Sequence, residues 1–173
     1  MARDGGVTLV ELAIVIAVLA VTVTVAVPGF GRMVSENRVI AQSNKFLSTL
    51  HLARSEAIRR GQRVTVCPST DGQSCSEDSP YNAGWILFAG PAVDEDLADA
   101  GPVLHGFPAS REGISISGNG SMARYISYVP SGRTAQLSGA FQAGTVSVCS
   151  DDGINRRIVI SRTGRARVVH DDC

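Results

Sequence analysis

The sequence predicts an α+β protein in which one long N-terminal helix packs on a C-terminal antiparallel β-domain. Residues 7–27 form an apolar run with a single charge, Glu11. Residues 30–60 then repeat apolar side chains every three or four positions, the period of an amphipathic helix. From residue 62 onward, short β-branched and aromatic runs alternate with Gly, Pro, Ser and Asn, which is typical of strands joined by turns. We therefore expect a helix that is transmembrane in its N-half and amphipathic in its C-half.

Length and composition limit the classes of protein to consider. The 173 residues allow one domain with a tail rather than two full domains. Sixteen Lys and Arg balance sixteen Asp and Glu, so the chain is neither uniformly basic nor uniformly acidic. With 44% hydrophobic residues the chain is too apolar to be disordered. Because the apolar excess is concentrated in one segment, a protein with several membrane spans is also excluded.

The N-terminal apolar run is long enough to cross a bilayer. As a helix, residues 7–27 would span ~31 Å at about 1.5 Å per residue, which matches a hydrocarbon core. A cleaved secretory signal fits poorly, because the run is long for such a signal and no A-x-A-like site follows it. A plain anchor does not explain Glu11, since a carboxylate inside a span costs about 2.5 kcal/mol or more and usually has a functional partner.

The residues around Glu11 resemble the processing motif of type IV prepilins. Gly5 and Gly6 end a short hydrophilic leader, and Val7-Thr8-Leu9-Val10-Glu11 follows. The resemblance implies that a prepilin peptidase cuts between Gly6 and Val7 and methylates the new amine, although the family usually begins its mature chain with Phe. It also implies that Glu11 directs assembly by pairing with the Val7 amine of a neighbouring subunit, because a buried carboxylate needs a buried cation. The alternative is an isolated acid near the lipid headgroups.

Three segments follow from these patterns. Residues 1–6 are the leader, residues 7–61 the N-terminal helix with its transmembrane segment 7–27, and residues 62–173 a disulfide-bonded, β-rich globular domain. Pro28 and Gly29 favour a kink in the helix, and Gly61 is expected to end it. The apolar stripe of the amphipathic half contains Ile40, Ser43, Leu47, Leu50, Ala53 and Ala57, flanked by Phe46 and Ile58.

Seven runs of the C-terminal segment are predicted as strands. They are 63–67, 84–88, 114–117, 124–129, 145–149, 157–161 and 165–170. Residues 90–102 are acidic and lack a strand pattern, so we expect a loop there.

The four cysteines predict disulfides. A domain exported past the inner membrane meets an oxidising compartment, and four cysteines allow three pairings. We favour Cys67–Cys75, which closes a local turn, together with Cys149–Cys173, which would hold the C-terminus against the last strands. A zinc site is the rival, but the cysteine spacings match no common zinc motif. No metal or other cofactor is therefore expected.

Two Gly-Arg turns and one helical segment make the resemblance more specific. Gly132-Arg133 and Gly164-Arg165 each follow a predicted strand, and Leu52-Ala53-Arg54-Ser55-Glu56-Ala57 lies on the helix. With Trp85, they resemble the pilin subfamily that contains the FimT and FimU minor pilins and the GspH pseudopilin. The resemblance implies a filament subunit that is not an enzyme, with other pilins or pseudopilins as partners. It also implies a single-pass inner-membrane protein whose globular domain lies in the periplasm before assembly. After assembly the protein would be part of a pilus or pseudopilus, and a pilus subunit would reach the cell surface.

A DNA-binding motif of that subfamily is present near the C-terminus. FimT-like members take part in DNA uptake, and a Gly-Arg-x-Arg motif is implicated in binding; here it is Gly164-Arg165-Ala166-Arg167. In a strand, Arg165 and Arg167 would point to one face about 6.6 Å apart. Guanidinium groups bind phosphates, so this pair would form a phosphate contact, with Arg162 beside it. Contacts to double-stranded DNA would be independent of sequence and sensitive to salt.

Several functions stay open from the sequence. The arginines could instead keep a strand edge soluble, and Asp171 and Asp172 could neutralise them. The leading interpretation is a FimT/FimU-like minor type IV pilin, a filament subunit for pilus assembly. The competing class is a nucleic-acid-binding module that is displayed on that filament and binds DNA for natural transformation. The alternative is a GspH-type minor pseudopilin of the type II secretion system. Catalysis is not expected, because none of the histidines has a nucleophile or carboxylate at a recognisable spacing; these are His51, His105 and His170.

Overall fold

The computed structural model describes the chain except for residues 1–5, 7, 77, 91–101, 111 and 171–173. The chain divides into two compact units, residues 1–35 and residues 36–173. Helix α1, Leu9–Arg60, contributes to both units. It ends where Gly61 adopts a φ of 64°, a left-handed conformation that glycine takes up without steric cost.

The first unit presents its apolar side chains outward. Ile14, Ile16 and Leu19 are each more than half exposed, although they lie on different sides of the helix. Within the described part of the chain, no helix is long and apolar enough to cross a membrane. The predicted span 7–27 includes Val7, which lies outside the described residues, and residues 25–27, whose side chains the structure does not describe.

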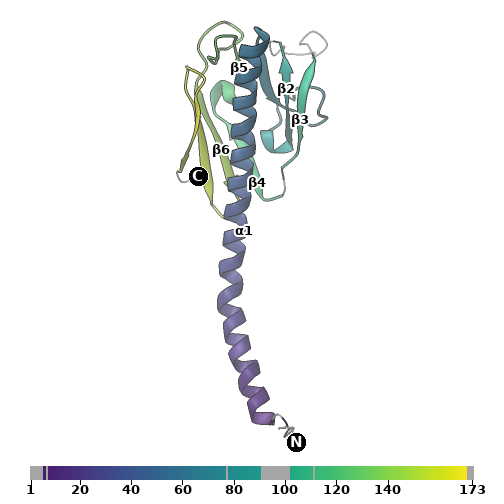
Figure 1. Ribbon diagram of the computed structural model, residues 1–173, viewed down its shortest axis with the longest axis vertical. Coiled ribbons are helices and arrows are strands. Elements are labelled where there is room, and N and C mark those ends of the chain that lie inside the picture. Colours follow the sequence, from purple (N-terminus) through teal and green to yellow (C-terminus); the bar gives the residue numbers. More distant parts are fainter. Residues whose placement is uncertain (1–5, 7, 77, 91–101, 111, 171–173) are drawn as a thin grey trace, which may run out of the picture. The chain divides into compact units, whose positions relative to one another are not determined.

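The second unit contains two four-stranded antiparallel sheets. The first has the order β3-β2-β1-β5, with β1 Val64–Pro68, β2 Gly84–Ala89, β3 Val103–Pro108 and β5 Ile126–Tyr128. The second has the order β4-β6-β7-β8, with β4 Ile114–Gly118, β6 Gly144–Ser150, β7 Asn155–Ile160 and β8 Ala166–His170. Short 3-10 helices cover Tyr81–Ala83 and Gly120–Ala123. In Figure 1 the yellow strands lie on one side of α1, and β2 and β3 lie on the other.

The second half of α1 packs on the β-domain through one apolar face, which confirms the predicted α+β fold. The fully buried residues on this face recur every three or four positions; they are Val39, Ser43, Phe46, Leu50, Ala53 and Ala57. The centre of the face therefore lies on Val39 and Phe46, whereas the predicted Ile40 and Leu47 are half-buried and Ile58 is 54% exposed.

Aromatic rings fix the helix to the first sheet. Phe46 meets Tyr81 and Trp85 edge-on, with ring centroids 5.0 and 5.3 Å away. The Trp85 indole Nε1 donates a hydrogen bond to the Thr49 hydroxyl at 3.2 Å. The Trp85 ring also stacks on the Phe107 ring of β3, with ring centroids 5.3 Å apart. Such contacts between rings stabilise beyond the area that they bury.

All seven predicted strands are present, with ends within two residues of those predicted, but β3 was missed. Its sequence, Val103-Leu104-His105-Gly106-Phe107-Pro108, contains both Gly and Pro and is mostly exposed. It forms the edge of its sheet, where neither residue is excluded. The alternation of apolar and polar residues that identifies a half-buried strand is therefore weak in β3.

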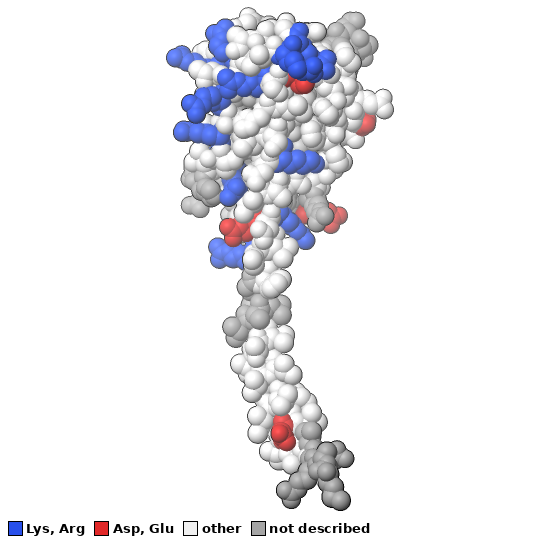
Figure 2. All heavy atoms as spheres, viewed as in Figure 1, with Lys and Arg blue, Asp and Glu red and all other residues white. Residues whose placement is uncertain are grey.

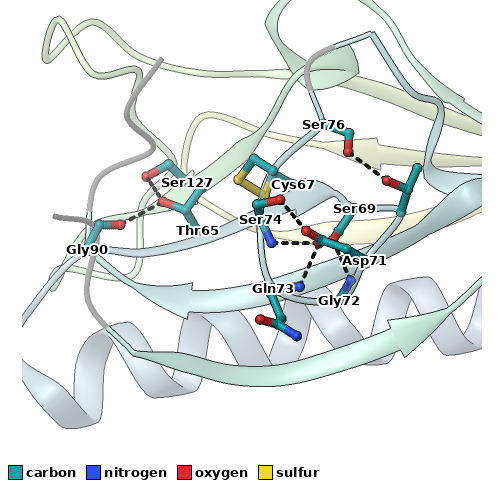
Figure 3. Close-up of a disulfide and its surroundings, with 12 residues drawn as sticks. Thr65, Cys67, Ser69, Asp71, Gly72, Gln73, Ser74, Ser76, Gly90 and Ser127 are labelled. Atoms are coloured by element: carbon teal, nitrogen blue, oxygen red, sulfur yellow. Dashed lines mark hydrogen bonds between the residues drawn. A yellow bond between two sulfur atoms is a disulfide. The ribbon is translucent and has the colours of Figure 1, made fainter. Parts of the chain in front are cut away.

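The predicted Cys67–Cys75 disulfide is present and closes the loop after β1. The Asp71 carboxylate organises this loop (Figure 3): it accepts hydrogen bonds from the Ser74 hydroxyl at 2.6 Å, the Ser74 and Gln73 amides at 2.7 and 2.8 Å, and the Ser69 hydroxyl at 3.0 Å. These bonds, the Ser74 hydroxyl above all, hold the pKa of Asp71 well below its ordinary value of 3.8.

Other predicted features include residues outside the described part of the chain. They are the leader 1–6 apart from Gly6, the Val7 amine, most of the acidic loop 90–102, Cys173 as the predicted disulfide partner of Cys149, and the acids Asp171 and Asp172. Each of these stays a prediction.

Candidate nucleic-acid interface

The Gly-Arg-x-Arg motif forms the turn between β7 and β8. The Ser161 amide donates to the Arg165 carbonyl at 3.0 Å, and the Gly164 amide donates to the Ser161 carbonyl at 2.8 Å. Gly164 has a φ of 78°, which favours glycine. Arg165 directly precedes β8, and Arg167 lies opposite Val159 of β7. The turn thus reverses the chain and starts the strand that carries Arg167.

Arg165 and Arg167 lie on the same outer surface of the second sheet. They line one depression of about 310 Å³ together with Val159, Ser161 and Thr163. Both arginines are exposed, and neither has an ion-pair partner among the described residues. Two exposed guanidinium groups on one depression can bind adjacent phosphate oxygens.

Arg162 lies in a neighbouring depression rather than with Arg165 and Arg167. This second depression has a volume of about 400 Å³ and is also lined by Arg133 and Phe141. Thr163 borders both depressions, so the two adjoin at the turn. The sequence pattern did not indicate Phe141, an exposed aromatic residue just after the Ser138-Gly139 turn, as part of a site.

Of the two arginines on β7, Arg157 shares the outer face of the sheet with Arg167. Residues directly opposite each other in an antiparallel pair lie on the same face, so Val159 is on the face of Arg167. Arg157 is on that face too, because it is two residues from Val159 in the same strand. Arg156 lies on the opposite face, with the buried Ile158. Arg157 therefore joins Arg167, and Arg165 just before β8, on the outer face of the sheet.

The glycine of the motif lies against the other Gly-Arg turn and against α1. A Cβ added to Gly164 would overlap the Gly132 carbonyl oxygen, and one added to Gly132 would lie 2.9 Å from Ile58 Cδ1. Arg54 of α1 donates from Nη1 to the Gly164 carbonyl at 3.3 Å. Three features that the sequence showed separately thus form one contact cluster. Close approach to the Gly132 backbone requires a glycine at position 164, whereas position 132 favours glycine because its φ is 74°.

The charges at this end of the domain favour an anion. Figure 2 shows Lys and Arg gathered on the upper left of the view, with few acids near them. Glu56, at the end of α1, accepts from Arg60 and Arg59 at 2.6 Å each. Hydrogen bonds from Arg60 and Arg59 hold the pKa of Glu56 below its ordinary value of 4.5. The last cations of α1 are therefore already paired, in contrast to Arg165 and Arg167.

Of the predicted processing and assembly residues, the structure describes Gly6 and Glu11, at the start of α1. Gly6 is exposed and precedes the helix. Thr8 caps the helix: its carbonyl accepts from the Leu12 amide at 3.1 Å and its hydroxyl from the Glu11 amide at 3.2 Å. Thr8 and Glu11 have the spacing of a capping box, a signal that the sequence reasoning missed. Glu11 is exposed in the first turn, where the helix dipole favours an acid.

Comparison with known proteins decides the family. Residues 42–164 match the family model described as type II transport protein GspH. The chain belongs to this family. No curated protein sequence matches it significantly. In this GspH-family chain, the matched residues include Arg54, Gly132 and Gly164, and they end just before Arg165 and Arg167.

Two solved structures share the fold of this GspH-family chain. The type IV minor pilin FimU of Pseudomonas aeruginosa strain PAO1, in space group P21, has a TM-score of 0.60 at 17% identity, covering 79% of this chain and 93% of that chain. The minor pseudopilin EpsH from the type 2 secretion system of Vibrio cholerae has a TM-score of 0.53 at 16% identity, covering 77% and 97%. Across the described residues, no three His, Cys, Asp or Glu gather as a metal site requires.

Proposed function

We propose that this chain is a minor type IV pilin, a structural filament subunit rather than an enzyme. The observation that carries the proposal is the half of α1 in residues 1–35, whose apolar side chains are exposed on several sides. Such a surface requires lipid or other apolar helices to cover it. Before assembly the cover would be the inner membrane, with residues 7–27 as the span and the β-domain in the periplasm. In the filament it would be the helices of other pilins.

The N-terminal residues would act at two stages. Gly6 is exposed and outside the helix, so a prepilin peptidase would reach the Gly6–Val7 bond without unwinding α1. After cleavage, Glu11 would pair with the Val7 amine of a neighbouring subunit. Removing either charge would leave the other buried without a partner, which is strongly unfavourable.

The second candidate is a minor pseudopilin of a type II secretion system, which the family description and the likeness to EpsH favour. Deletion of the gene in its host distinguishes the two functions. A pilin predicts loss of surface pili with normal secretion of exported enzymes, and a pseudopilin predicts the reverse. Complementation with the parent chain should restore the lost property. Normal piliation and normal secretion in the deletion strain would contradict both candidates.

We further propose that the filament subunit binds double-stranded DNA through Arg165 and Arg167, without sequence preference, as natural transformation requires. What supports this is that both side chains are exposed on one depression and lack ion-pair partners within the described residues. Arginines that only keep the edge strand β8 soluble would not change DNA binding when they are replaced, so the experiment below distinguishes the two roles.

The test is a gel shift with duplex DNA across a range of salt concentrations. Arg165→Gln with Arg167→Gln should remove most binding and lower the slope of log K against log salt by about two phosphate contacts. The matched control is Arg59→Gln with Arg60→Gln, which removes the same charge from residues that already pair with Glu56 and should change binding little. Unchanged binding by the Arg165/Arg167 variant would contradict the proposed contact.

A further inference from the structure

The depression between the two Gly-Arg turns has the size and the chemistry of a nucleotide pocket. Its volume of about 400 Å³ is within the range of small-ligand sites. Arg133 comes from the first turn, Arg162 and Thr163 come from the second, and Phe141 forms an apolar wall. Cationic, hydroxyl and aromatic groups therefore line one concave site.

Phe141 is held in an ordered hairpin although its side chain is 67% exposed. Its backbone pairs with Ala135, and the Gln136 amide donates to the Ala140 carbonyl at 2.8 Å, closing the intervening turn. The Phe141 carbonyl also accepts from the Gln136 side chain at 3.4 Å. The hairpin thus holds the backbone of Phe141 in place, and the exposed ring offers a face on which a planar group can stack.

The two arginines of the pocket remain available to an anion. Arg133 donates from Nε to the Ser131 hydroxyl at 3.3 Å, which leaves its terminal nitrogens. Arg162 is exposed and has no ion-pair partner among the described residues. The Thr134 hydroxyl donates to the Ser161 carbonyl at 3.1 Å, so the two turns that carry these arginines are linked. A phosphate between them would meet two cationic side chains carried on linked turns.

We propose that this pocket binds one unpaired nucleotide of single-stranded DNA, with its phosphate at Arg133 and Arg162 and its base stacked on Phe141. A base inside a duplex is already stacked on both sides, so it cannot present its face to the ring. The pocket therefore prefers a single strand, whereas Arg165 and Arg167 contact phosphates of either form. The inference deepens the proposed DNA-binding function, but the residues that give the preference are different.

The experiment compares two labelled probes on the full-length protein in detergent: an oligo-dT strand of about 15 nucleotides and a duplex of equal length. Phe141→Ala should weaken single-strand binding by about 5- to 150-fold, the range for loss of one stacked base, and leave duplex binding unchanged. Phe141→Trp should retain it. Leu137→Ala is the matched control, because Leu137 is a 38% exposed apolar residue of the same hairpin that does not line the pocket.

A second readout separates stacking from a general loss of affinity. A single 2-aminopurine in the strand should be quenched by the parent protein and by the Leu137→Ala variant, but not by the Phe141→Ala variant. Equal weakening of both probes by Phe141→Ala, or no weakening of the single strand, would overturn the pocket.

The same titrations keep the two proposals distinct. If the parent binds the single strand in a Phe141-dependent manner but the Arg165/Arg167 variant still binds duplex normally, the pocket is supported and the phosphate contact is wrong. If the Arg165/Arg167 variant loses duplex binding while Phe141→Ala affects neither probe, the phosphate contact is supported and the pocket is wrong. Absence of binding to both probes at low salt would overturn both.

Discussion

The Arg54 guanidinium on α1 donates a hydrogen bond to the carbonyl oxygen of Gly164, which lies 110 residues further along the chain, at 3.3 Å. Gly164 in turn lies against the Gly132 carbonyl so closely that a Cβ would overlap it. The turn that precedes Arg165 is therefore held from two directions, by the helix and by the other Gly-Arg turn. The position of the motif depends on this packing as well as on the β7–β8 hairpin.

Gly164→Ala should destabilise the domain more than Gly153→Ala. Both glycines lie in hairpin turns of the second sheet with a φ of 78°. In either variant the alanine must adopt this left-handed conformation, which costs about 1–2 kcal/mol of folding stability. A Cβ at Gly153 meets nothing within 4 Å, whereas one at Gly164 meets the Gly132 backbone, which adds an overpacking cost of about 1–3 kcal/mol. Urea unfolding measures the difference. Equal midpoints for the two variants would contradict the close contact.

The mature chain should begin at Val7 with a methylated amine. The expectation follows from the exposed, non-helical Gly6 and from an acid at the fifth position of the apolar segment. Intact-mass measurement of protein purified from membranes or filaments checks it, with a strain lacking prepilin peptidase as the control. A chain that retains residues 1–6 in cells with active peptidase would refute the processing site.

Glu11→Ala should leave membrane insertion intact, because the segment becomes more apolar, but should impair incorporation into filaments. The reason is that the Val7 amine of the neighbouring subunit loses its partner. Thr8→Ala is the matched control, since it removes the helix cap but keeps the carboxylate. Immunoblots of membrane and filament fractions measure both steps. Normal incorporation of the Glu11→Ala chain would rule out the assembly role.

Peptide mapping without reduction should recover Cys67 linked to Cys75, as in the structure, and Cys149 linked to Cys173. Each closed loop should stabilise the folded state by roughly 2–4 kcal/mol, because a disulfide restricts the unfolded chain. Cys67→Ser with Cys75→Ser should accordingly lower the urea midpoint. Four free thiols in protein prepared from the periplasm would disprove both pairings.

Asp71→Asn should destabilise the domain in a manner that depends on pH. The folded state lowers the pKa of Asp71 below 3.8, so the stabilisation is fully present above the unfolded pKa and is lost as the pH falls through the folded pKa. The gap in thermal midpoint between parent and variant should be constant from pH 7 to about 5. It should then begin to shrink below about pH 4. A gap that widens on acidification would show that the carboxylate does not act in this way.

Local patterns predicted the elements well because helices and half-buried strands impose periods on nearby residues. The alternation that puts Arg165 and Arg167 on one surface is such a short-range property. Proximity in the sequence also groups Arg162 with them, but the reversal at Gly164 places Arg162 in the neighbouring pocket. The contact of Gly164 with Arg54 depends on segments far apart in the chain. No local period encodes such a contact, so it required the structure.

The side-chain attachment of α1 has a mechanical consequence. The Phe46 ring between Tyr81 and Trp85, the Trp85–Thr49 hydrogen bond and the Arg54–Gly164 hydrogen bond all lie along one face of the helix. A pull along the helix axis therefore loads them together in shear, instead of opening them one after another. If the helix slipped along the domain by one turn, about 5.4 Å, Phe46 would lose its contacts with the Tyr81 and Trp85 rings and both hydrogen bonds would break. The domain should thus resist tension up to a sharp threshold and then release in one step.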